Sequence, residues 1–576
     1  MGLGILDDKY MDHVPGTTRY FDDPDRPQYA ADGMQGLKCD TSGPVPIILV
    51  PQPSDDPNDP LNWPLWKRDL ITFILSLTAI FGTALGPILA ANTVTLSIWF
   101  AVEFSRVAML TGYFLLGVGV AGFIFVPSGR IWGKRHLFVG GTVLLVVTSV
   151  WGGASGKNYT SLLWSRIFQG IATAPFESLV NAAVGDLYCV HQRGIRMAFT
   201  NLAVFGGAFF TPILVGKITH TIYWWWTFYL VAIFCALSLP AIFFFCPEMA
   251  YRRETSLNLD LLATENPATF KHMDNDKDGH EKSGVSNTPT AAQDSSATGE
   301  PTEVNRTSET HDAVYPIPPK KTFRQSLALF DGRKTDESFW KLLLRPLPLF
   351  IQPAFLWACL IQGLLIGWTV FIGVIMAQFF LATPLWWDEV NTGYAYTAAF
   401  IGAILGFVIA GALSDWSARY MTKLNGGVYE PEFRIVLVIP QMILGCAGLF
   451  GWGITVDGLL HSEYPYPVPL TFFALEVAGM VIGAVASSLY IVDAYRDLAI
   501  EGFTCMIIFK NIFSFALTFK AFDWLVANRS KAAPLFNALG AVQLAVCFSS
   551  IPLYIYGKRL RGYFYRHDLL AKFGLR

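Results

Sequence analysis

Charged residues are scarce in this sequence. Asp, Glu, Lys and Arg make up 15% of its 576 residues, whereas a soluble domain carries about 25%. The formal net charge is −2, and no long basic run is present, so we expect no nucleic-acid partner. Hydrophobic residues reach 53%. This balance indicates an integral membrane protein.

Motifs typical of enzymes and metal sites are also missing. The eight cysteines stand singly without a CxxC spacing, so they are predicted to be small core residues and neither disulfides nor metal ligands. HExxH, a nucleophile elbow and the Gly-rich Lys loop of ATP-driven proteins do not occur. We therefore expect no catalytic residues, no metal and no other cofactor.

The apolar stretches predict an all-α integral membrane protein. Each is long enough to cross a bilayer as a helix. In the first half they cover 70–96, 107–126, 137–155, 159–184, 197–218 and 224–246, and in the second half 348–374, 394–413, 435–456, 470–492, 503–525 and 535–556. The layout is twelve transmembrane helices in two six-helix bundles.

Polar segments divide the chain into five predicted regions. Residues 1–66 lack an apolar signal-peptide core and are expected to form a disordered cytosolic segment. Residues 67–246 form the N-terminal bundle, 247–346 a cytosolic linker that is largely disordered by composition, 347–556 the C-terminal bundle and 557–576 a basic cytosolic tail.

Lys and Arg predict the orientation. They concentrate in the connections on one side and in the C-terminal tail, so the positive-inside rule places both termini and the linker in the cytoplasm. On this assignment, Asn158 and Asn528 begin the N-x-S/T sequons that face outward and are the glycosylation candidates. The cytoplasmic cations are Arg130, Lys134, Arg135, Arg193, Arg196, Arg419, Lys423, Arg434, Lys558, Arg559, Arg561 and Arg566.

A polar stripe interrupts the fourth apolar stretch. Arg166, Gln169, Thr173 and Glu177 fall on one face of a helix, together with Gly170. Charged groups facing lipid are costly, so the stripe must face other helices or a wet cavity. The structural interpretation is a buried ion pair or helix cap, and the functional interpretation is that the stripe lines a passage.

Two carboxylates are candidates for proton coupling. Burial favours the neutral form of a carboxyl group, which suits a group that takes up and releases protons. Glu177 and Glu476 are these candidates, with a structural ion pair or a packing role as their alternatives. Lys510, in the eleventh stretch, must be paired or neutral, and its structural alternative is a bond to Asp493 or Glu476. Further candidates for the cavity wall are Asn511, Ser514, Tyr113 and Trp368.

The two halves share a sequence repeat. GFIFVPSGRIWGKRH at 122–136 and GFVIAGALSDWSARY at 406–420 align without a gap, each after the second helix of its half. Such a match predicts duplicated bundles related by a pseudo-twofold axis, with the substrate site between them.

Several motifs in order resemble those of the major facilitator superfamily. They are DPLNWP at 59–64, GKR at 133–135, RIFQG at 166–170, APFE at 174–177, DLY at 186–188, GALSD at 411–415 and YIVDAY at 490–495. More narrowly, the chain resembles the fungal branch of twelve-span proton-coupled drug antiporters, including their polyamine and cation transporter relatives. The resemblance covers about residues 59–556 without the linker.

The resemblance implies gating at the cytoplasmic loops. Gly133, Lys134 and Arg135 correspond to the family's inner-loop motif, and Asp415 with Arg419 corresponds to it in the second half. The position of the motif's acidic residue falls on Arg130 or Ile131, so the first half must be latched differently. Asp493 and Arg496, where the tenth stretch meets the cytoplasm, are further candidates for a gate or cap.

The sequence thus predicts a secondary transporter that works by alternating access. The preferred hypothesis is proton-coupled efflux of a hydrophobic drug or fungal secondary metabolite. Gly206-Gly207, Thr211-Pro212 and Gly216 depart from the family's antiporter motif on the fifth helix, which keeps proton-coupled uptake of an amine or cation as the alternative. A transporter-like sensor is the hypothesis from another class. Partners would be a small-molecule substrate, a proton gradient and the lipid bilayer around a monomer, in the plasma membrane or alternatively the vacuolar membrane.

Overall fold

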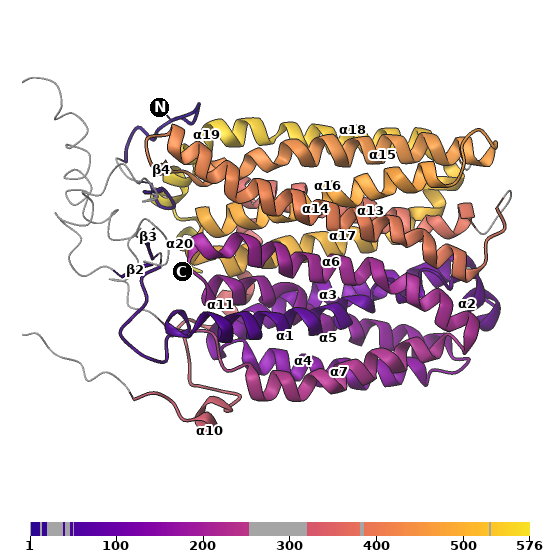
Figure 1. Ribbon diagram of the computed structural model, residues 1–576, viewed down its shortest axis with the longest axis horizontal. Coiled ribbons are helices and arrows are strands. Elements are labelled where there is room, and N and C mark those ends of the chain that lie inside the picture. The colour runs from indigo at the N-terminus through magenta and orange to yellow at the C-terminus, as the bar shows by residue number, and fades with distance from the viewer. Residues whose placement is uncertain are drawn as a thin grey trace, which may run out of the picture.

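The protein is described by a computed structural model that covers residues 2–11, 14–19, 38–40, 47–49, 51–252, 319–380, 385–528 and 531–575. Long helices run side by side, and both termini lie at one end of them (Figure 1). We call this end the terminal end and the opposite one the far end. The N-terminal and C-terminal halves form two neighbouring bundles.

Twelve long helices of the described residues make up these bundles, as expected. Ten helical segments are long and apolar enough to cross a membrane, and α1 and α5 complete the twelve. The N-terminal bundle holds α1 (Leu65–Ala84), α3 (Phe104–Trp132), α4 (Arg135–Gly153), α5 (Tyr159–Leu187), α6 (Val190–Thr221) and α7 (Trp225–Phe245). The C-terminal bundle holds α13 (Pro353–Phe380), α14 (Glu389–Leu424), α15 (Val438–Leu460), α16 (Pro467–Ala494), α17 (Ala499–Ala527) and α18 (Ala532–Phe548).

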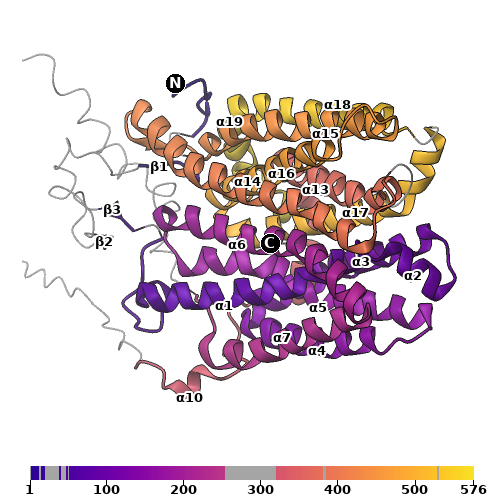
Figure 2. The ribbon, with the colours of Figure 1, turned by 45° about the vertical axis from the view of Figure 1, so that its right-hand side comes forward.

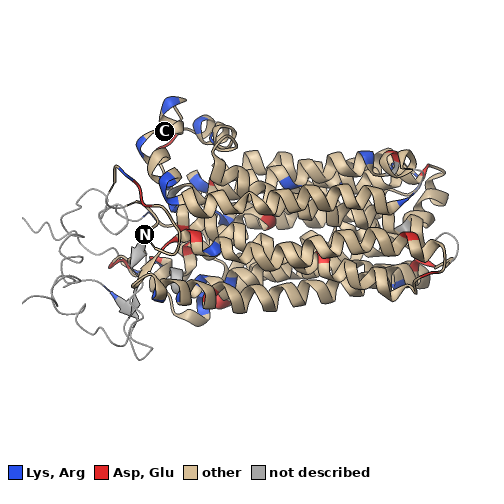
Figure 3. Cartoon of the chain, turned by 90° about the horizontal axis from the view of Figure 1, so that it is seen from above, with Lys and Arg blue, Asp and Glu red and all other residues tan. Residues whose placement is uncertain are grey.

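Charged residues are distributed unevenly along the length of the helices. Lys, Arg, Asp and Glu gather near the two ends of the helices, and few lie along their middle (Figure 3). Because a charge facing hydrocarbon costs several kcal/mol, the few charges at mid-helix depth must be held inside the protein. They mark the places where a site is to be sought.

The bundles meet along two helix pairs, α6 with α14 and α3 with α17. Small residues permit the first contact. A Cβ added at Gly393 would lie 2.5 Å from the carbonyl oxygen of Pro212, so only glycine allows the two backbones to approach this closely. Gly216 meets the start of α14 in the same way. The altered motif, which lies on α6 (the fifth expected span), therefore serves close packing between the bundles.

Two of the expected spans are interrupted. The stretch 70–96 was expected to be one helix, but α1 ends at Ala84 and is followed by η3 (Pro87–Leu89) and α2 (Thr93–Phe100). Pro87 has no N–H to continue the helical ladder, and its fixed φ suits the first turn of a new helix. The stretch 535–556 was also expected to be one helix, but α18 ends at Phe548 and α19 (Ser550–Arg566) follows it. α19 extends into the predicted tail, which also contains α20 (Leu569–Lys572).

Part of the N-terminal segment is packed rather than disordered. Ile5 and Val14 are buried, and β1 (Thr18–Arg19) pairs with β4 (Val428–Tyr429) before the short helix η6 (Pro431–Leu437). A second small pair joins β2 (Cys39–Asp40) and β3 (Ile47–Ile48), and η2 (Pro60–Asn62) precedes α1. Disorder predicted over 1–66 is therefore wrong for residues 2–11 and 14–19. We call these two stretches the N-terminal arm.

The linker also has a described part. Residues 319–345, here called the strap, contain α10 (Phe323–Ser326) and α11 (Phe339–Leu344) and lead into α12 (Pro346–Leu349). The strap is fixed to the N-terminal bundle, since Lys334 donates its N–H to the Ile131 carbonyl at 2.7 Å. The remaining disorder prediction, for residues 253–318, lies outside the described residues.

Candidate functional site

A cavity of about 150 Å³ lies between the two bundles. Its wall comes from α1, η3, α2, α3, α5 and α6 on one side and from α13, α14, α16 and α17 on the other. Most of the lining side chains are apolar, among them Phe114, Phe205 and Val370. The cavity thus combines an apolar surface with few polar groups, as small-molecule sites usually do.

The charged lining of this cavity is an ion pair between the bundles. Lys510 on α17 places its Nζ 2.8 Å from a carboxylate oxygen of Glu177 on α5. The Asn511 side chain donates to the same carboxylate at 3.4 Å, and the aromatic ring of Phe205 lies 5.8 Å from the Lys510 Nζ. The side chains of Glu177 and Lys510 are only 8% and 7% exposed. The partner of Lys510 is therefore Glu177, and not Asp493 or Glu476, the two named for its structural alternative.

The second carboxylate lies behind the opposite wall. Glu476 on α16 is fully buried, and the Thr369 hydroxyl on α13 donates to it at 2.7 Å. Thr369 and Met480 line the cavity, whereas the carboxyl group itself is not part of the lining. Thr369 thus stands between Glu476 and the cavity.

The polar stripe of α5 divides into two parts. Glu177 reaches the cavity, but Arg166, Gln169 and Thr173 are buried inside the N-terminal bundle. Arg166 donates to the carbonyl oxygens of Gly86 at 3.0 Å and Leu110 at 3.3 Å and to the side chain of Gln169 at 2.9 Å. Its guanidinium group also lies 4.8 Å from the ring centre of Phe114.

These contacts correct the prediction of a passage lined by the whole stripe. Arg166 holds the bend at Gly86 against α3, so it supports two parts of the wall from behind. Gln169 donates to the Thr148 carbonyl on α4, and Thr173 donates to the Gly82 carbonyl on α1. The hydrogen bonds satisfy polar groups that would otherwise be buried without partners.

Three further wall candidates also pack outside the lining of this cavity. Trp368 is buried beside Phe513, with ring centres 5.3 Å apart, and Ser514 is buried on the same helix as Phe513. Tyr113 packs against Phe515 at 6.1 Å. Sequence periodicity identified the helices correctly but not the faces that these residues occupy.

The first-half loop is latched by acids from elsewhere in the chain. Gly133 has φ 91°, in the region that favours glycine. Glu248, just after α7, accepts the N–H groups of Lys134 at 2.9 Å and Arg135 at 3.0 Å, and the Lys134 ammonium lies 2.5 Å from Asp186. Sequence reasoning did not identify Glu248 as a contact of this loop.

A second group of charges joins the bundles at the terminal end. Arg130 on α3 pairs with Glu501 on α17, and Arg345 lies 3.4 Å from Glu501 and 2.5 Å from Glu337 of the strap. Glu501 is 1% exposed. We call Arg130, Glu337, Arg345 and Glu501 the terminal-end cluster.

The second-half candidates separate into a bonded and an exposed set. Asp415 lies 3.7 Å from Arg434, which also approaches Asp493 at 3.1 Å. Asp493 accepts in addition from the Tyr429 hydroxyl at 2.5 Å. Arg419, the other candidate for the second-half latch, is exposed on α14. Arg496 lies in η7 (Arg496–Leu498), directly after α16.

The two glycosylation candidates lie at the far end. Asn158 is exposed and caps α5, since its side chain accepts the N–H of Ser161 at 3.1 Å. Asn528 follows α17 and donates to the Trp524 carbonyl at 2.8 Å, while the rest of its sequon lies outside the described residues.

Comparison with known proteins identifies the family. A model of the Major Facilitator Superfamily matches residues 70–500, most of the chain. The chain belongs to the major facilitator superfamily. It is accordingly a multi-pass membrane transporter and not an enzyme.

Individual relatives agree with this assignment. Protein HOL1 of Saccharomyces cerevisiae is 26% identical, over 96% of this chain and 97% of its own. Efflux pump radE of Floropilus chiversii is 22% identical, over 88% and 84%. Among solved structures, the proton:xylose symporter XylE of E. coli matches with a TM-score of 0.52 at 12% identity, over 85% of this chain and 96% of that one. That likeness concerns the fold alone.

Proposed function

We propose that this transporter exports a hydrophobic small molecule in exchange for protons by alternating access. The observation that carries the proposal is the apolar cavity between the bundles, with the Glu177–Lys510 pair as its charged element. An apolar wall favours an apolar substrate, and a carboxylate that can be neutralised offers a means of coupling.

In the proposed mechanism, a proton on Glu177 weakens its attraction to Lys510. Because the two residues belong to different bundles, their ion pair favours the arrangement in which the bundles are close at this depth. Its loss shifts the population toward a state in which they separate. Glu476 is the second candidate proton carrier, reached through the Thr369 hydroxyl.

The terminal-end cluster acts in this proposal as the gate on that side. Opening the terminal end requires Arg130 and Glu501 to separate, and the Asp415–Arg434–Asp493 group would reorganise with α14 and α16. At the far end, contact between the halves includes the Thr95 hydroxyl and Glu389. Alternating access would break these two sets of contacts in turn.

Support for export comes from one relative, efflux pump radE of Floropilus chiversii. Uptake of an amine or cation is the second candidate. It is favoured by the charge balance at the cavity, where the carboxylates of Glu177 and Glu476 lie at or behind the wall and Lys510 supplies one ammonium group. A sensor of the same fold would bind a ligand without coupled flux.

The proposal places the monomer in the plasma membrane, with the vacuolar membrane as the alternative. The terminal end carries the cationic loops and would face the cytoplasm by the positive-inside rule. Asn158 and Asn528 would then face outward, where glycosylation is possible.

The test is proton flux in liposomes that contain the purified protein. A panel of apolar amines and neutral metabolites is added to wild type and to the Glu177→Gln and Glu476→Gln variants. We expect one or more compounds to drive proton movement in wild type and Glu177→Gln to abolish it, with the direction of flux distinguishing export from uptake. Absence of gradient-dependent flux for every compound, or unchanged flux in Glu177→Gln, would refute coupling through Glu177 and favour uniport or sensing.

A further inference from the structure

The strap lies where the membrane surface would be. Figures 1 and 2 both show α10 at the rim of the N-terminal bundle, near the ends of α4 and α7. Its backbone is tied to the helix ends, because Arg135 donates to the Ser326 carbonyl and Lys334 to the Ile131 carbonyl. This position corresponds to the headgroup layer beside the bundle.

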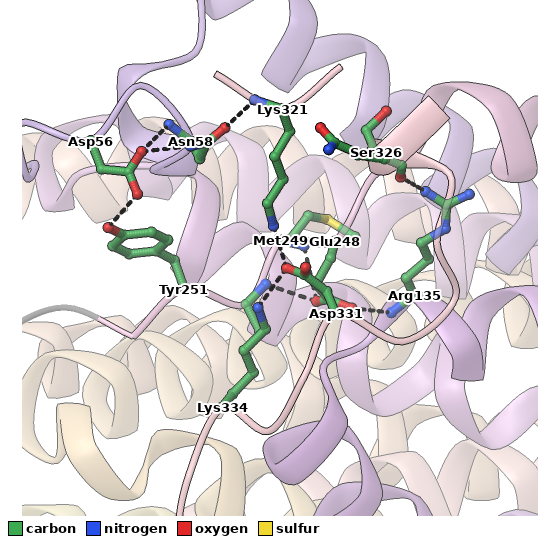
Figure 4. Close-up of polar contacts among 12 residues, drawn as sticks. Asp56, Asn58, Arg135, Glu248, Met249, Tyr251, Lys321, Ser326, Asp331 and Lys334 are labelled. Carbon is green, nitrogen blue, oxygen red and sulfur yellow. Dashed lines mark hydrogen bonds and ion pairs between the residues drawn. The ribbon is translucent and has the colours of Figure 1, made fainter. Parts of the chain in front are cut away.

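Polar contacts fix the strap in place (Figure 4). Asp331 accepts from Lys321 at 2.5 Å and from Lys334 at 2.8 Å. Upstream, the N–H of Lys321 donates to the Asn58 side chain at 2.9 Å, and Asn58 in turn donates to the Pro319 carbonyl at 3.2 Å. The strap is therefore an ordered part of the terminal end, and hydrogen bonds join it to the segment that precedes α1.

The strap carries an excess of positive charge. Residues 319–345 contain seven Lys or Arg and three Asp or Glu. All three acids are engaged: Asp331 with two lysines, Asp336 with Arg252 at 3.0 Å and Glu337 with Arg345. Lys320 and Arg324 are exposed and receive no ion pair from these acids.

Another cation lies close to Lys320. Lys67, in the first turn of α1, is near enough for its charge and that of Lys320 to repel each other, and its Nζ lies 3.9 Å from the ring centre of Trp63. Large exposed apolar side chains adjoin these cations in the sequence: Trp66 precedes Lys67 and is 68% exposed, and Phe323 precedes Arg324 and is 65% exposed. We call Trp66, Lys67, Lys320, Phe323 and Arg324 the rim patch.

We propose that the rim patch binds the headgroup of an anionic phospholipid. The lipid phosphate would lie beside Lys67 and Lys320, whose charges repel each other without it, with Arg324 as a further cation. The aromatic side chains would enter the interfacial layer that Trp and Phe favour. Charge complementarity thus commits the site to an anionic lipid rather than to a zwitterionic one. The inference does not depend on the direction or coupling of transport.

The experiment measures thermal unfolding of the full-length protein in detergent. Dioctanoyl-phosphatidylserine, dioctanoyl-phosphatidylcholine or inorganic phosphate is titrated, without any transport substrate. The test variant is Lys320→Gln/Arg324→Gln, and the matched control is Lys9→Gln/Lys572→Gln, which removes two exposed cations from the same end of the molecule.

We expect phosphatidylserine alone to raise the Tm of wild type and of the control. Its apparent Kd should rise on the order of thirtyfold in the test variant, since each of the two cations near a membrane surface contributes about 1 kcal/mol and about 1.4 kcal/mol corresponds to a tenfold change. Phe323→Ser should weaken the same response without changing charge. Equal affinity in the test variant and wild type would overturn the proposal. Equal stabilisation by inorganic phosphate would also overturn it, because the patch would then be a general anion site.

Discussion

Glu177 and Lys510 join the two bundles through an ion pair of 2.8 Å at the wall of the cavity. One stands on α5 and the other on α17, and both are nearly buried. A pair in this position has to be broken or stretched whenever the bundles move apart at this depth. The contribution of this ion pair to the stability of the folded protein can be measured separately from its role in transport.

We predict that the pair behaves as a unit in stability. Lys510→Met leaves a buried carboxylate without its cation, and Glu177→Gln leaves a buried ammonium without its acid. Breaking a buried pair on one side costs about 3–5 kcal/mol, whereas replacing both partners by neutral groups is often close to neutral. We therefore expect either single variant to lower the Tm markedly and the double variant to recover most of the loss.

Thermal unfolding of the four proteins in one detergent measures this double-mutant cycle. Thr518→Ala serves as the control, because Thr518 is buried on the same helix and bonds only locally, to the Ser514 carbonyl, among the described contacts. If the losses of the two single variants simply add in the double variant, then the two side chains do not stabilise each other.

A second prediction concerns the terminal-end cluster. Glu501→Gln removes the buried carboxylate that pairs with Arg130 and Arg345, so the last turn of α3 and the strap should exchange their amide hydrogens faster. Asp523→Asn is the matched control on the same helix, since its pair with Lys520 is exposed and worth about 0.5 kcal/mol. Hydrogen exchange followed by mass spectrometry checks both variants. Unchanged exchange in Glu501→Gln would show that this end is held by other contacts.

The architecture was predictable from sequence because membranes impose a simple rule. A span needs about 20 apolar residues, so helix number and approximate position follow from hydropathy, and the repeated loop motif indicated the two halves. Glu177 was identified for a related reason. A carboxylate in an apolar span is costly unless it is enclosed, so its presence alone marks a site.

The partners of these residues were not predictable in the same way. Lys510 could be assigned to a helix but not to Glu177, because the rotation of each helix within its bundle depends on packing between many side chains. Arg166 shows the same limit, since helical periodicity placed it on the face of Glu177, yet it turns toward Gly86. Glu248 and Glu501 lie at helix ends, where acids are common and give little signal. The break at Pro87 could have been found from Gly86-Pro87.

Gly133 supports a third prediction. A Cβ at this position would collide with the carboxylate of Glu248, and φ is 91°. Gly133→Ala should therefore destabilise the protein by about 1–3 kcal/mol through backbone strain and loosen the Glu248 latch. Gly140→Ala is the control, because no atom lies within 4 Å of the added Cβ and alanine favours a helix by up to about 1 kcal/mol. Thermal unfolding should lower the Tm of the first variant only, and equal Tm values would contradict the strain argument.

The N-terminal arm is held to the C-terminal bundle by carboxylates, which supports a prediction on pH. Glu430 accepts from Thr17 at 2.7 Å and pairs with Arg561 at 2.9 Å and Lys558 at 2.7 Å. Burial alone would raise the pKa of Glu430, but the charges of Arg561 and Lys558 outweigh burial and hold it below the ordinary 4.5. The pKa of Asp7 is also lowered: partial desolvation would raise it, but the hydrogen bond and the charge of Lys558, 3.0 Å away, outweigh that effect.

The direction of the pH effect on stability follows from proton binding. A carboxyl group with a lower pKa in the folded protein binds protons more readily when unfolded, so its stabilisation is fully present above about pH 4.5 and is lost as the pH falls through the folded value. The arm should therefore stay docked at pH 7 and loosen below about pH 4. Hydrogen exchange of residues 2–11, corrected for the intrinsic pH dependence of exchange, measures the change. Glu430→Gln should loosen the arm already at pH 7, whereas Asp388→Asn, at the far end, should not. An arm that is equally protected at both pH values in wild type would mean that apolar contacts of Ile5 and Val14 hold it without the carboxylates.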